Sequence, residues 1–245
     1  MDRVYPFAKE AKHYHCFSRD LDIKQHRDYL KGKAGDPDSA MRLVTDLALP
    51  FLTALRPEIP ANSIFVSPYA QEAAGDNALP LMISLMCAEL FKGTSEVDIV
   101  QQERVFHTGA DPMERLILRP SFEGQVQPGS QYFLVDDVTS MGGTLAELNN
   151  FIRIHGGEVA GTLVLVNAGR TKDFIASKKT LRLLEERHHD DIKQLFGIHT
   201  PAITANEANY LIGFRTLDEI RNRCIKAKEE TNKRLLSKGY QRAHR

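Results

Sequence analysis

The amino-acid sequence predicts an α/β fold with a parallel sheet and helices on its faces. Between residues 39 and 167, short apolar runs of strand length alternate three times with helix-like stretches, and this alternation is typical of parallel α/β sheets. The runs at 64–66 and 132–135 are continuously apolar and the run at 159–166 is mostly so, as in strands that are buried on both faces. Loops rich in polar residues or glycine follow them, and ligands bind at that edge of an open parallel sheet.

The remaining elements are expected in the following order. Residues 1–38 are polar with several turn signals, which predicts an irregular cap. A helix is expected from Asp38 or Ser39 to about residue 55, with a kink at Pro50. Residues 101–131 are expected to form a long excursion with a functional role, with a strand candidate at 116–118. The other expected elements are a helix at 78–91, a strand at 97–100 and helices at 145–155, 175–195 and 217–236.

Composition and charge limit the classes of protein to which this chain can belong. The chain has 245 residues, 42% of them apolar, and a formal net charge of zero, so no global field favours nucleic acid or an anionic membrane. Residues 215–245 are basic, with ten Lys/Arg against four Asp/Glu. We expect an α/β domain with its cap over residues 1–200 and a helical, basic extension over residues 201–245.

Cysteine usage and hydropathy point to the reducing cytoplasm. The three cysteines are far apart and form no C-x-x-C pair, which excludes a disulfide framework or a zinc pattern. The first residues have no apolar signal core. The longest apolar stretch is well short of the ~20 residues that a membrane helix needs.

Two histidine clusters raise the question of a metal site. His13, His15 and Cys16 have no second cluster of matching spacing, which favours a cap segment over a ligand set. Residues 188–191 read His-His-Asp-Asp within a predicted helix. Adjacent helical residues point in different directions, so a solvated face is the favoured interpretation.

The chemistry concentrates in residues 132–144, YFLVDDVTSMGGT. The loop has no G-x-x-x-x-G-K-[ST], so it is not a P-loop. It is not G-x-G-x-x-G either, and its acids precede the glycines. Backbone N–H groups and hydroxyls at a helix N-terminus favour an anion. Asp136 and Asp137 can accept hydrogen bonds from sugar hydroxyls, and their charge would favour positive charge developing on a sugar ring.

These residues carry a resemblance to a known family. Residues 135–144, VDDVTSMGGT, resemble the phosphoribosyl diphosphate (PRPP) signature of the type I phosphoribosyltransferases. A weaker resemblance covers residues 60–170, where Val66-x-Pro68 and Gly75-x-Asn77 are similar to the competence-protein-F-like branch. The 101–131 excursion lies where the family has its mobile catalytic loop. The resemblance implies a Mg²⁺-dependent transfer of ribose 5-phosphate from PRPP to a nucleobase or related nitrogen acceptor, with release of diphosphate, in nucleotide metabolism.

The resemblance also assigns residues. Asp136 and Asp137 match the acids that hold the ribose hydroxyls, and they are the expected metal ligands. Arg115 and Arg119 are expected to act with them in catalysis; exposed surface charges are the alternative interpretation of these two arginines. The expected ligand-binding residues are Val138, Thr139, Ser140, Met141, Gly142, Gly143, Thr144, Pro68 and Tyr69.

The diphosphate side departs from the family. Residues 69–76 contain two acids and no Lys or Arg, where a diphosphate is expected. Arg115, Arg119 or Lys92 could supply the missing charge, together with Mg²⁺ held mostly by substrate oxygens and water. Met141 also replaces a usual threonine, and Thr139 replaces a usual apolar residue.

Two functions follow from this pattern. The first is a PRPP-dependent transferase, which by family likeness is a homodimer. The second is a PRPP- or nucleotide-binding regulator without turnover, or a component of a multi-protein system. Such a protein could contact nucleic acid through its basic C-terminal helix. A solvated or partner-packing helix is the favoured interpretation. The acceptor is not specified, although Asn167 and Arg170 follow the last strand, where this family often contacts the base.

Overall fold

The computed structural model describes residues 1–68, 77–102 and 110–237, and in them the chain forms an α/β fold around a five-stranded parallel sheet. The sheet order is β1-β7-β6-β2-β3, built from β1 (Lys12–Phe17), β2 (Ile64–Val66), β3 (Thr94–Glu96), β6 (Gln131–Thr139) and β7 (Glu158–Asn167). A separate antiparallel pair joins β4 (Val100–Gln101) to β5 (Phe122–Glu123). Among the described residues no helix is sufficiently long and apolar to cross a membrane.

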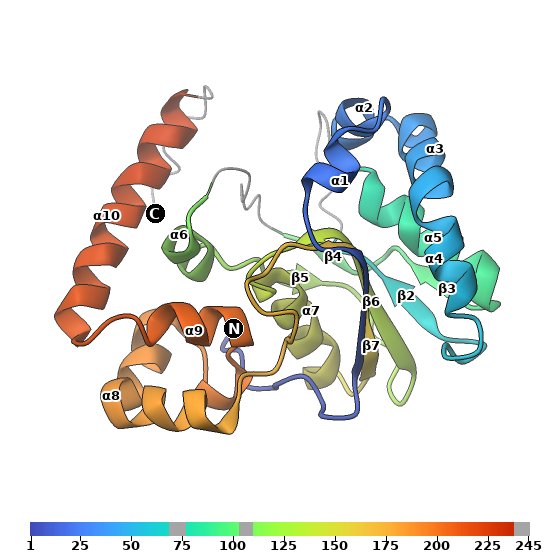
Figure 1. Cartoon of the computed structure of the whole chain (residues 1–245). Coiled ribbons are helices and arrows are strands. Elements are labelled where there is room, and N and C mark those ends of the chain that lie inside the picture. The colour runs from blue at the N-terminus through green and yellow to red at the C-terminus, as the bar shows by residue number, and fades with distance from the viewer. Residues whose placement is uncertain (69–76, 103–109, 238–245) are drawn as a thin grey trace.

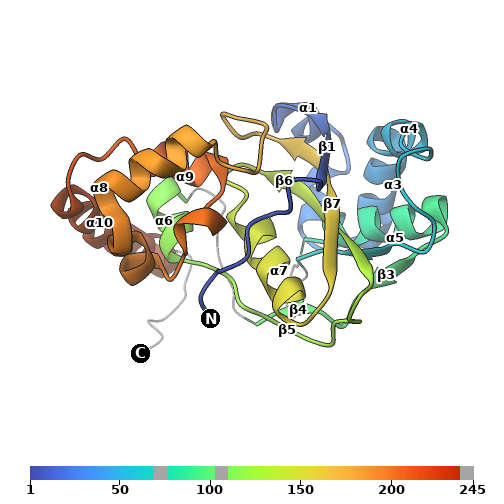
Figure 2. The same cartoon turned by 90° about the horizontal axis from the view of Figure 1, so that it is seen from below.

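Helices cover both faces of the sheet (Figures 1 and 2). One face carries α3 (Pro37–Leu47), α4 (Leu49–Ala54) and α5 (Leu79–Phe91), with α1 (Leu21–Lys24) and α2 (Tyr29–Lys33) at one end of that layer. The other face carries α7 (Gly143–Ile154). Beyond α7 lies a helical group of α6 (Pro112–Ile117), α8 (Lys178–Phe196), η1 (Thr200–Ala202), α9 (Ala205–Leu211) and α10 (Leu217–Ser237).

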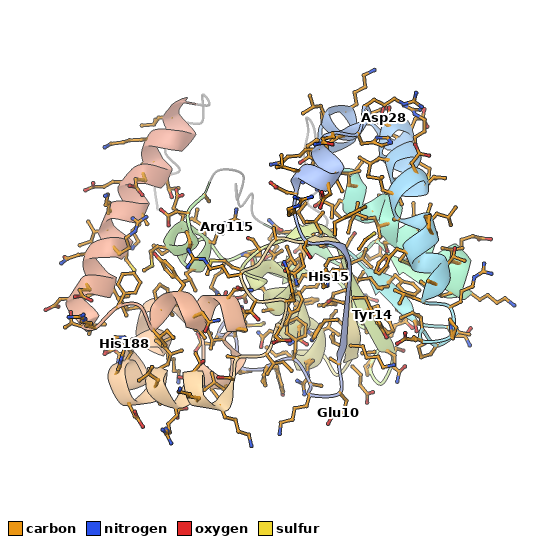
Figure 3. All side chains as sticks on the ribbon, viewed as in Figure 1. Glu10, Tyr14, His15, Asp28, Arg115 and His188 are labelled. Carbon is orange, nitrogen blue, oxygen red and sulfur yellow. The ribbon has the colours of Figure 1, made fainter. Side chains whose placement is uncertain are left out.

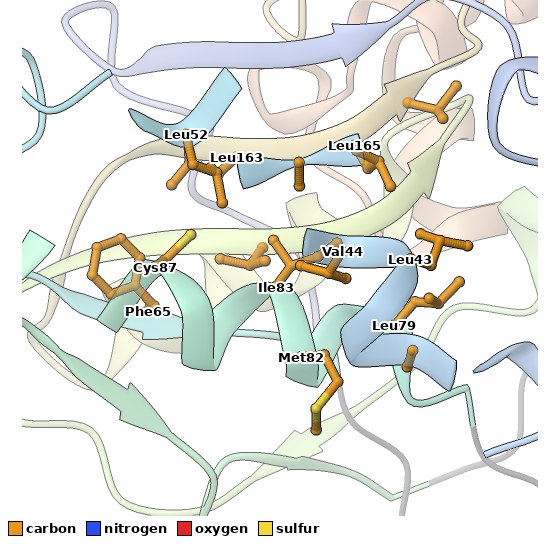
Figure 4. Close-up of a cluster of buried hydrophobic side chains, with 14 of the residues drawn as sticks. Leu43, Val44, Leu52, Phe65, Leu79, Met82, Ile83, Cys87, Leu163 and Leu165 are labelled. Atoms are coloured by element: carbon orange, nitrogen blue, oxygen red, sulfur yellow. The ribbon is translucent and has the colours of Figure 1, made fainter. Parts of the chain in front are cut away.

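Three apolar clusters hold these layers together. The first fills the space between the sheet and α3–α5, and includes the side chains of Figure 4, such as Phe65, Ile83 and Leu163. The second packs Leu134 and its neighbours on β6 against α7. The third joins α6, α8, α9 and α10. Because the third cluster includes residues on both sides of position 200, apolar packing continues across the proposed boundary, and the division at 200/201 stays a prediction.

The N-terminal segment contains a strand that the sequence did not predict. β1 pairs in parallel with β7, from Lys12 opposite Gly161 to Phe17 opposite Val166. A Cβ on Gly161 would lie 2.0 Å from the Lys12 carbonyl oxygen, so glycine permits this close approach. The segment is only half buried and lacks an apolar run, because it lies at the edge of the sheet.

Other boundaries differ from the expected ones for local reasons. The strand expected at 97–100 is wrong: β3 is the polar segment 94–96, and Val97 is 48% exposed. The strand candidate at 116–118 is wrong too, because Asp111 and Glu114 form a capping box that starts α6. The predicted break near Pro50 is confirmed, since α3 ends at Leu47 and α4 begins at Leu49. The cap of α3 is Asp36, whose carboxylate accepts the Ser39 N–H, and Pro37 occupies the first helical position.

Candidate functional site

The sheet order defines where a ligand crevice should lie. From β2 the chain passes through α5 to β3 on one side, whereas from β6 it passes through α7 to β7 on the other. β2 and β6 are neighbours, with Val66 opposite Leu134. Their carboxyl ends therefore form the topological switch point, where open α/β sheets bind ligands.

A cleft of about 210 Å³ lies at this switch point. Pro68 follows β2, while Asp136 and residues 138–144 come from the end of β6 and the start of α7. The cleft brings together most of the residues that the sequence predicted. Asp137 does not line it, and Tyr69 lies outside the described residues. Its lining consists of Pro68, Asn77, Gln101, Arg115, Arg119, Pro120, Asp136, residues 138–144 and Glu207.

The loop between β6 and α7 presents a helix N-terminus to the cleft. Gly142 has φ +78°, a left-handed conformation that glycine adopts without strain, and a Cβ there would lie 3.1 Å from the Phe174 ring. No side chain caps α7. The first intrahelical bond runs from the Ala146 N–H to the Gly142 carbonyl at 2.9 Å. The preceding N–H groups have no partner within the helix, and such a terminus favours an anion.

The helical group supports this loop from behind. The Thr204 hydroxyl donates to the Met141 carbonyl at 2.6 Å. Glu207 closes a capping box with Thr204 at the start of α9. A Cβ on Gly143 would lie 2.8 Å from Glu207 Oε1, so any larger residue at position 143 would require this carboxylate to move. Glu207 therefore adds a negative charge to the wall of the cleft next to the start of α7.

The two adjacent acids face opposite sides of the sheet. Successive side chains of a strand point to opposite faces, and Asp136 lines the cleft whereas Asp137 is 2% exposed. The Asp137 carboxylate is 2.7 Å from Lys33 Nζ of α2. Its other oxygen accepts the Val138 N–H at 2.9 Å. Lys33 was not predicted as a site residue, and nothing in the local sequence indicates this pairing across about a hundred residues.

Burial and neighbouring charges perturb the pKa values of Asp136 and Lys33. Burial raises the pKa of Asp136 well above its usual value, and the neighbouring charge of Asp137 raises it further. Burial alone would lower the pKa of Lys33, but the charge of Asp137 and the hydrogen bond to it outweigh that effect and raise it. A strongly perturbed carboxyl that lines a cleft is a candidate functional group.

Arg119 belongs to a buried ionic network beside the cleft. Its Nε is 2.9 Å from Glu147 Oε1, and its guanidinium also donates to the carbonyls of Met1 and Phe196. Arg3 is completely buried, with Nη2 2.7 Å from Glu207 Oε2 and Nε 3.4 Å from Glu147 Oε1. Two arginines and two glutamates thus balance in charge. Burial lowers the pKa of Arg119, opposed by the charge of Glu147.

Arg115, which is labelled on α6 in Figure 3, lines both the cleft and a second cavity. Its Nε donates to the Ala110 carbonyl at 3.1 Å. The second cavity, of about 550 Å³, shares Arg115, Ser140 and Met141 with the cleft and also contacts Arg170 and Tyr210. Asn167 does not line this cavity but shapes the loop after β7, accepting the Gly169 N–H at 3.0 Å and donating to the Lys172 carbonyl at 3.1 Å.

Two expectations about other residues are corrected. Lys92 cannot reach the cleft, because the Asn62 N–H bonds to its carbonyl at the start of β2, the opposite end of the sheet. His188 is 1% exposed, with Nε2 3.2 Å from the Phe214 carbonyl oxygen, so it does not belong to a solvated face. In the part of the chain that the structure describes, no three His, Cys, Asp or Glu side chains form a metal-binding group.

The fold is α/β, with a five-stranded parallel sheet and helices on its faces. Solved structures with which it overlaps include the adenine phosphoribosyltransferase of Saccharomyces cerevisiae, at 15% identity over 54% of this chain and 70% of that one, with a TM-score of 0.34. The orotate phosphoribosyltransferase of Aeropyrum pernix overlaps over 55% and 63%, at 20% identity and a TM-score of 0.29. The α/β class rests on the parallel sheet and its helices.

Sequence comparison also finds relatives, two of which are not described as phosphoribosyltransferases. Protein TraN of Escherichia coli is 35% identical over 214 residues, which are 85% of this chain and 48% of TraN. An uncharacterized protein of Haemophilus influenzae is 30% identical over 133 residues, 54% of this chain and 30% of that protein. The orotate phosphoribosyltransferase of Pyrococcus abyssi is 40% identical over 45 residues, 18% of this chain and 25% of the enzyme.

The chain therefore spans about half the length of TraN, and less of the other two relatives. No protein-family model matches it. None of these relatives is described as competence-protein-F-like, so the comparisons give that finer likeness no support.

Proposed function

We propose that the cleft at the switch point binds PRPP. The observation that carries the proposal is the contiguity of Asp136 with residues 138–144 around one cleft at the N-terminus of α7. The free N–H groups of that terminus and the hydroxyls of the loop would hold the 5′-phosphate. Asp136 would accept hydrogen bonds from the ribose hydroxyls.

The charges around the cleft also bear on this proposal. Glu207 would repel a phosphate if it stood alone, but its carboxylate is 2.7 Å from the buried Arg3 guanidinium, which offsets its charge. Arg115 lines the same cleft and is the nearest candidate to meet the diphosphate. Arg119 would have to release a carbonyl or Glu147 to do so.

We further propose that the protein transfers ribose 5-phosphate to a nitrogen acceptor and releases diphosphate. The second cavity supports this step because it opens beside the phosphate loop and shares Arg115 with the cleft. An acceptor there would meet Tyr210, Asn209 and the exposed Arg170, which suits a planar ring with hydrogen-bonding or anionic groups. PRPP and the acceptor would be the protein's small-molecule partners, and the free thiols are in keeping with a cytoplasmic protein.

Magnesium fits this site only in part. Mg²⁺ usually keeps several waters and takes one or two carboxylates together with substrate phosphates. Asp136 lines the cleft and could be such a ligand, whereas Asp137 faces Lys33 at 2.7 Å. When bound with PRPP, the ion would neutralise charge on the diphosphate. The protein's own contribution is then the orientation of the ribose by Asp136 and of the phosphate by the loop.

Binding without transfer is the second candidate, and two observations favour it. Arg119 is held by Phe196, Met1 and Glu147, and only one of the two motif acids faces the cleft. Both features reduce the groups available to stabilise a transition state, yet leave the phosphate loop intact. The chain would then be a PRPP-binding component of a larger protein or system.

PRPP titration followed by an acceptor screen tests these proposals. Wild-type protein should bind PRPP by calorimetry, and Asp136→Asn should weaken binding by about tenfold, because an amide N–H₂ would replace one of the two carboxyl oxygens that face the ribose hydroxyls. Asp38→Asn, an exposed carboxylate on α3, is the matched control and should bind as wild type does. Diphosphate release with one of a panel of nucleobases would support transfer, and tight binding without release from any of them would support the second candidate. No PRPP binding by the wild type would refute both.

A further inference from the structure

Lys33 is placed beside the motif acids by the packing of α2. The Ala78 N–H donates to the Gly32 carbonyl at 3.1 Å, which ties α2 to the start of α5. A Cβ on Gly32 would lie 3.1 Å from Ala40 Cα and 3.2 Å from Leu79 Cδ2, so the helix is seated closely on its neighbours. Lys33, the last residue of α2, therefore has a fixed starting point from which its side chain reaches Asp137.

The contact between Lys33 and Asp137 is an ion pair at a buried position. The two charged groups are 2.7 Å apart, and the Asp137 side chain is 3% exposed while that of Lys33 is 31% exposed. Both Asp137 oxygens have a partner, since the other accepts the Val138 N–H. The lysine thus forms the link between an acid that solvent does not reach and the surface.

Asp136 forms no ion pair among the described contacts, although the charge of Lys33 also acts on it and partly opposes the rise of its pKa. Its Oδ1 accepts the Asp137 N–H at 2.9 Å, and it lines the cleft. The alternation of the strand separates the two acids, so that one is presented to a ligand and the other is neutralised behind the sheet. Pairing Asp137 with a cation favours the binding of phosphate in the cleft, because a second uncompensated carboxylate nearby would repel the ligand.

We propose that Lys33 is the counter-ion of Asp137 and a positioning residue of the cleft: it cancels the charge of Asp137 and holds that side chain away from the ligand, so that Asp136 alone meets the sugar. This division of roles differs from the one implied by the sequence motif, in which both acids hold the ribose. The proposal rests on the proposed function in taking the ligand to be a sugar phosphate. It also makes the N-terminal cap part of the site.

A double-mutant cycle tests the pairing through affinity. Lys33→Met, Asp137→Asn and the double variant are compared with wild type by calorimetry, with PRPP and with inorganic phosphate. Lys33→Met should weaken both ligands by about tenfold or more, because it exposes the cleft to an unpaired charge, and adding Asp137→Asn should recover most of that loss. Lys31→Met on the same helix, where Lys31 is exposed, is the matched control.

Thermal unfolding of the same four proteins gives a second readout that needs no ligand. The melting temperature of Lys33→Met should fall, and that of the double variant should exceed the value expected from adding the two single effects. Equal affinity of Lys33→Met and Lys31→Met, or no recovery in the double variant, would overturn the proposal. If wild type binds neither ligand, the proposed function fails, and the unfolding cycle alone decides the pairing: coupled effects support it and additive effects overturn it.

Discussion

At the scale of single residues, His13 shows how burial sets a charge state. Its ring packs against Phe174 and Phe7, with centroids 4.6 and 5.1 Å away, and its Nδ1 is 3.1 Å from the Thr162 hydroxyl. Its Nε2 is buried without a hydrogen-bond partner. Burial lowers the pKa of His13 to about 4, opposed by the charge of Asp173. The side chain is therefore a neutral part of the apolar contact that supports Gly142 through Phe174.

This lowered pKa predicts a pH dependence of folding stability. The unfolded chain protonates His13 near pH 6.5 and the folded chain only near pH 4, so the stabilisation is fully present above pH 6.5 and is lost as the pH falls toward 4. The loss is at most about 3.5 kcal/mol, from ~1.4 kcal/mol per pH unit. Urea unfolding of wild type and His13→Gln at several pH values measures it. Parallel stability profiles for the two proteins would contradict the assignment.

At the scale of elements, α10 is fastened to α6 by polar as well as apolar contacts. The buried Thr231 hydroxyl donates to Glu114 Oε1 at 2.7 Å. Arg223 pairs with Asp111, the residue that caps α6, and Ile220 and Ala227 are fully buried. Since α6 carries Arg115 into the cleft, the C-terminal helix supports one wall of the candidate site.

Removing the Thr231 hydroxyl should loosen this contact. Thr231→Val keeps the shape of the side chain but leaves the buried Glu114 oxygen without that donor, which should cost about 1–3 kcal/mol. Thr45→Val, at an exposed position of α3, should change stability by about 0.5 kcal/mol or less. Urea unfolding gives both values. Hydrogen exchange should show faster exchange in α10 of the Thr231 variant, and equal protection in the two variants would show that this bond does not fasten the helix.

At the scale of the whole molecule, Arg3 joins the N-terminal segment to α7 and α9. Its guanidinium contacts Glu147 and Glu207 and is completely buried. Neighbouring contacts strengthen the same junction, since Asn150 accepts the backbone N–H groups of Val4 and Tyr5. The network therefore links three segments that are far apart in sequence, and Glu207 brings it to the wall of the cleft.

Loss of Arg3 should destabilise the fold through an unpaired buried charge. Arg3→Met should lower the free energy of unfolding by about 3–5 kcal/mol, because two glutamates would then share one arginine. Adding Glu207→Gln removes one of these charges and keeps the capping box, which accepts Gln as well as Glu. Urea unfolding should show partial recovery in that double variant. Arg19→Met, an exposed arginine, serves as the control, and a double variant no more stable than Arg3→Met would argue against charge as the cause.

The sequence by itself determined the central unit of this protein. The apolar run at 132–135, the two acids, the glycines and the helix after them are local signals, and each reflects a short-range preference of backbone or side chain. They predicted β6, α7 and the anion-binding loop, and the cleft forms where they meet. The α/β class followed from the same periodicities, because strand and helix patterns are readable within about ten residues.

Only the tertiary structure decided which of the two acids lines the cleft and which charges surround them. Lys33, Arg3 and Glu207 reach the β6–α7 unit from segments 60 to 140 or so residues away, and no local pattern records such pairings. β1 likewise became a strand because an edge of β7 was available. Long-range packing therefore set the electrostatics of the cleft, because the charged residues that neutralise its side chains come from distant parts of the sequence.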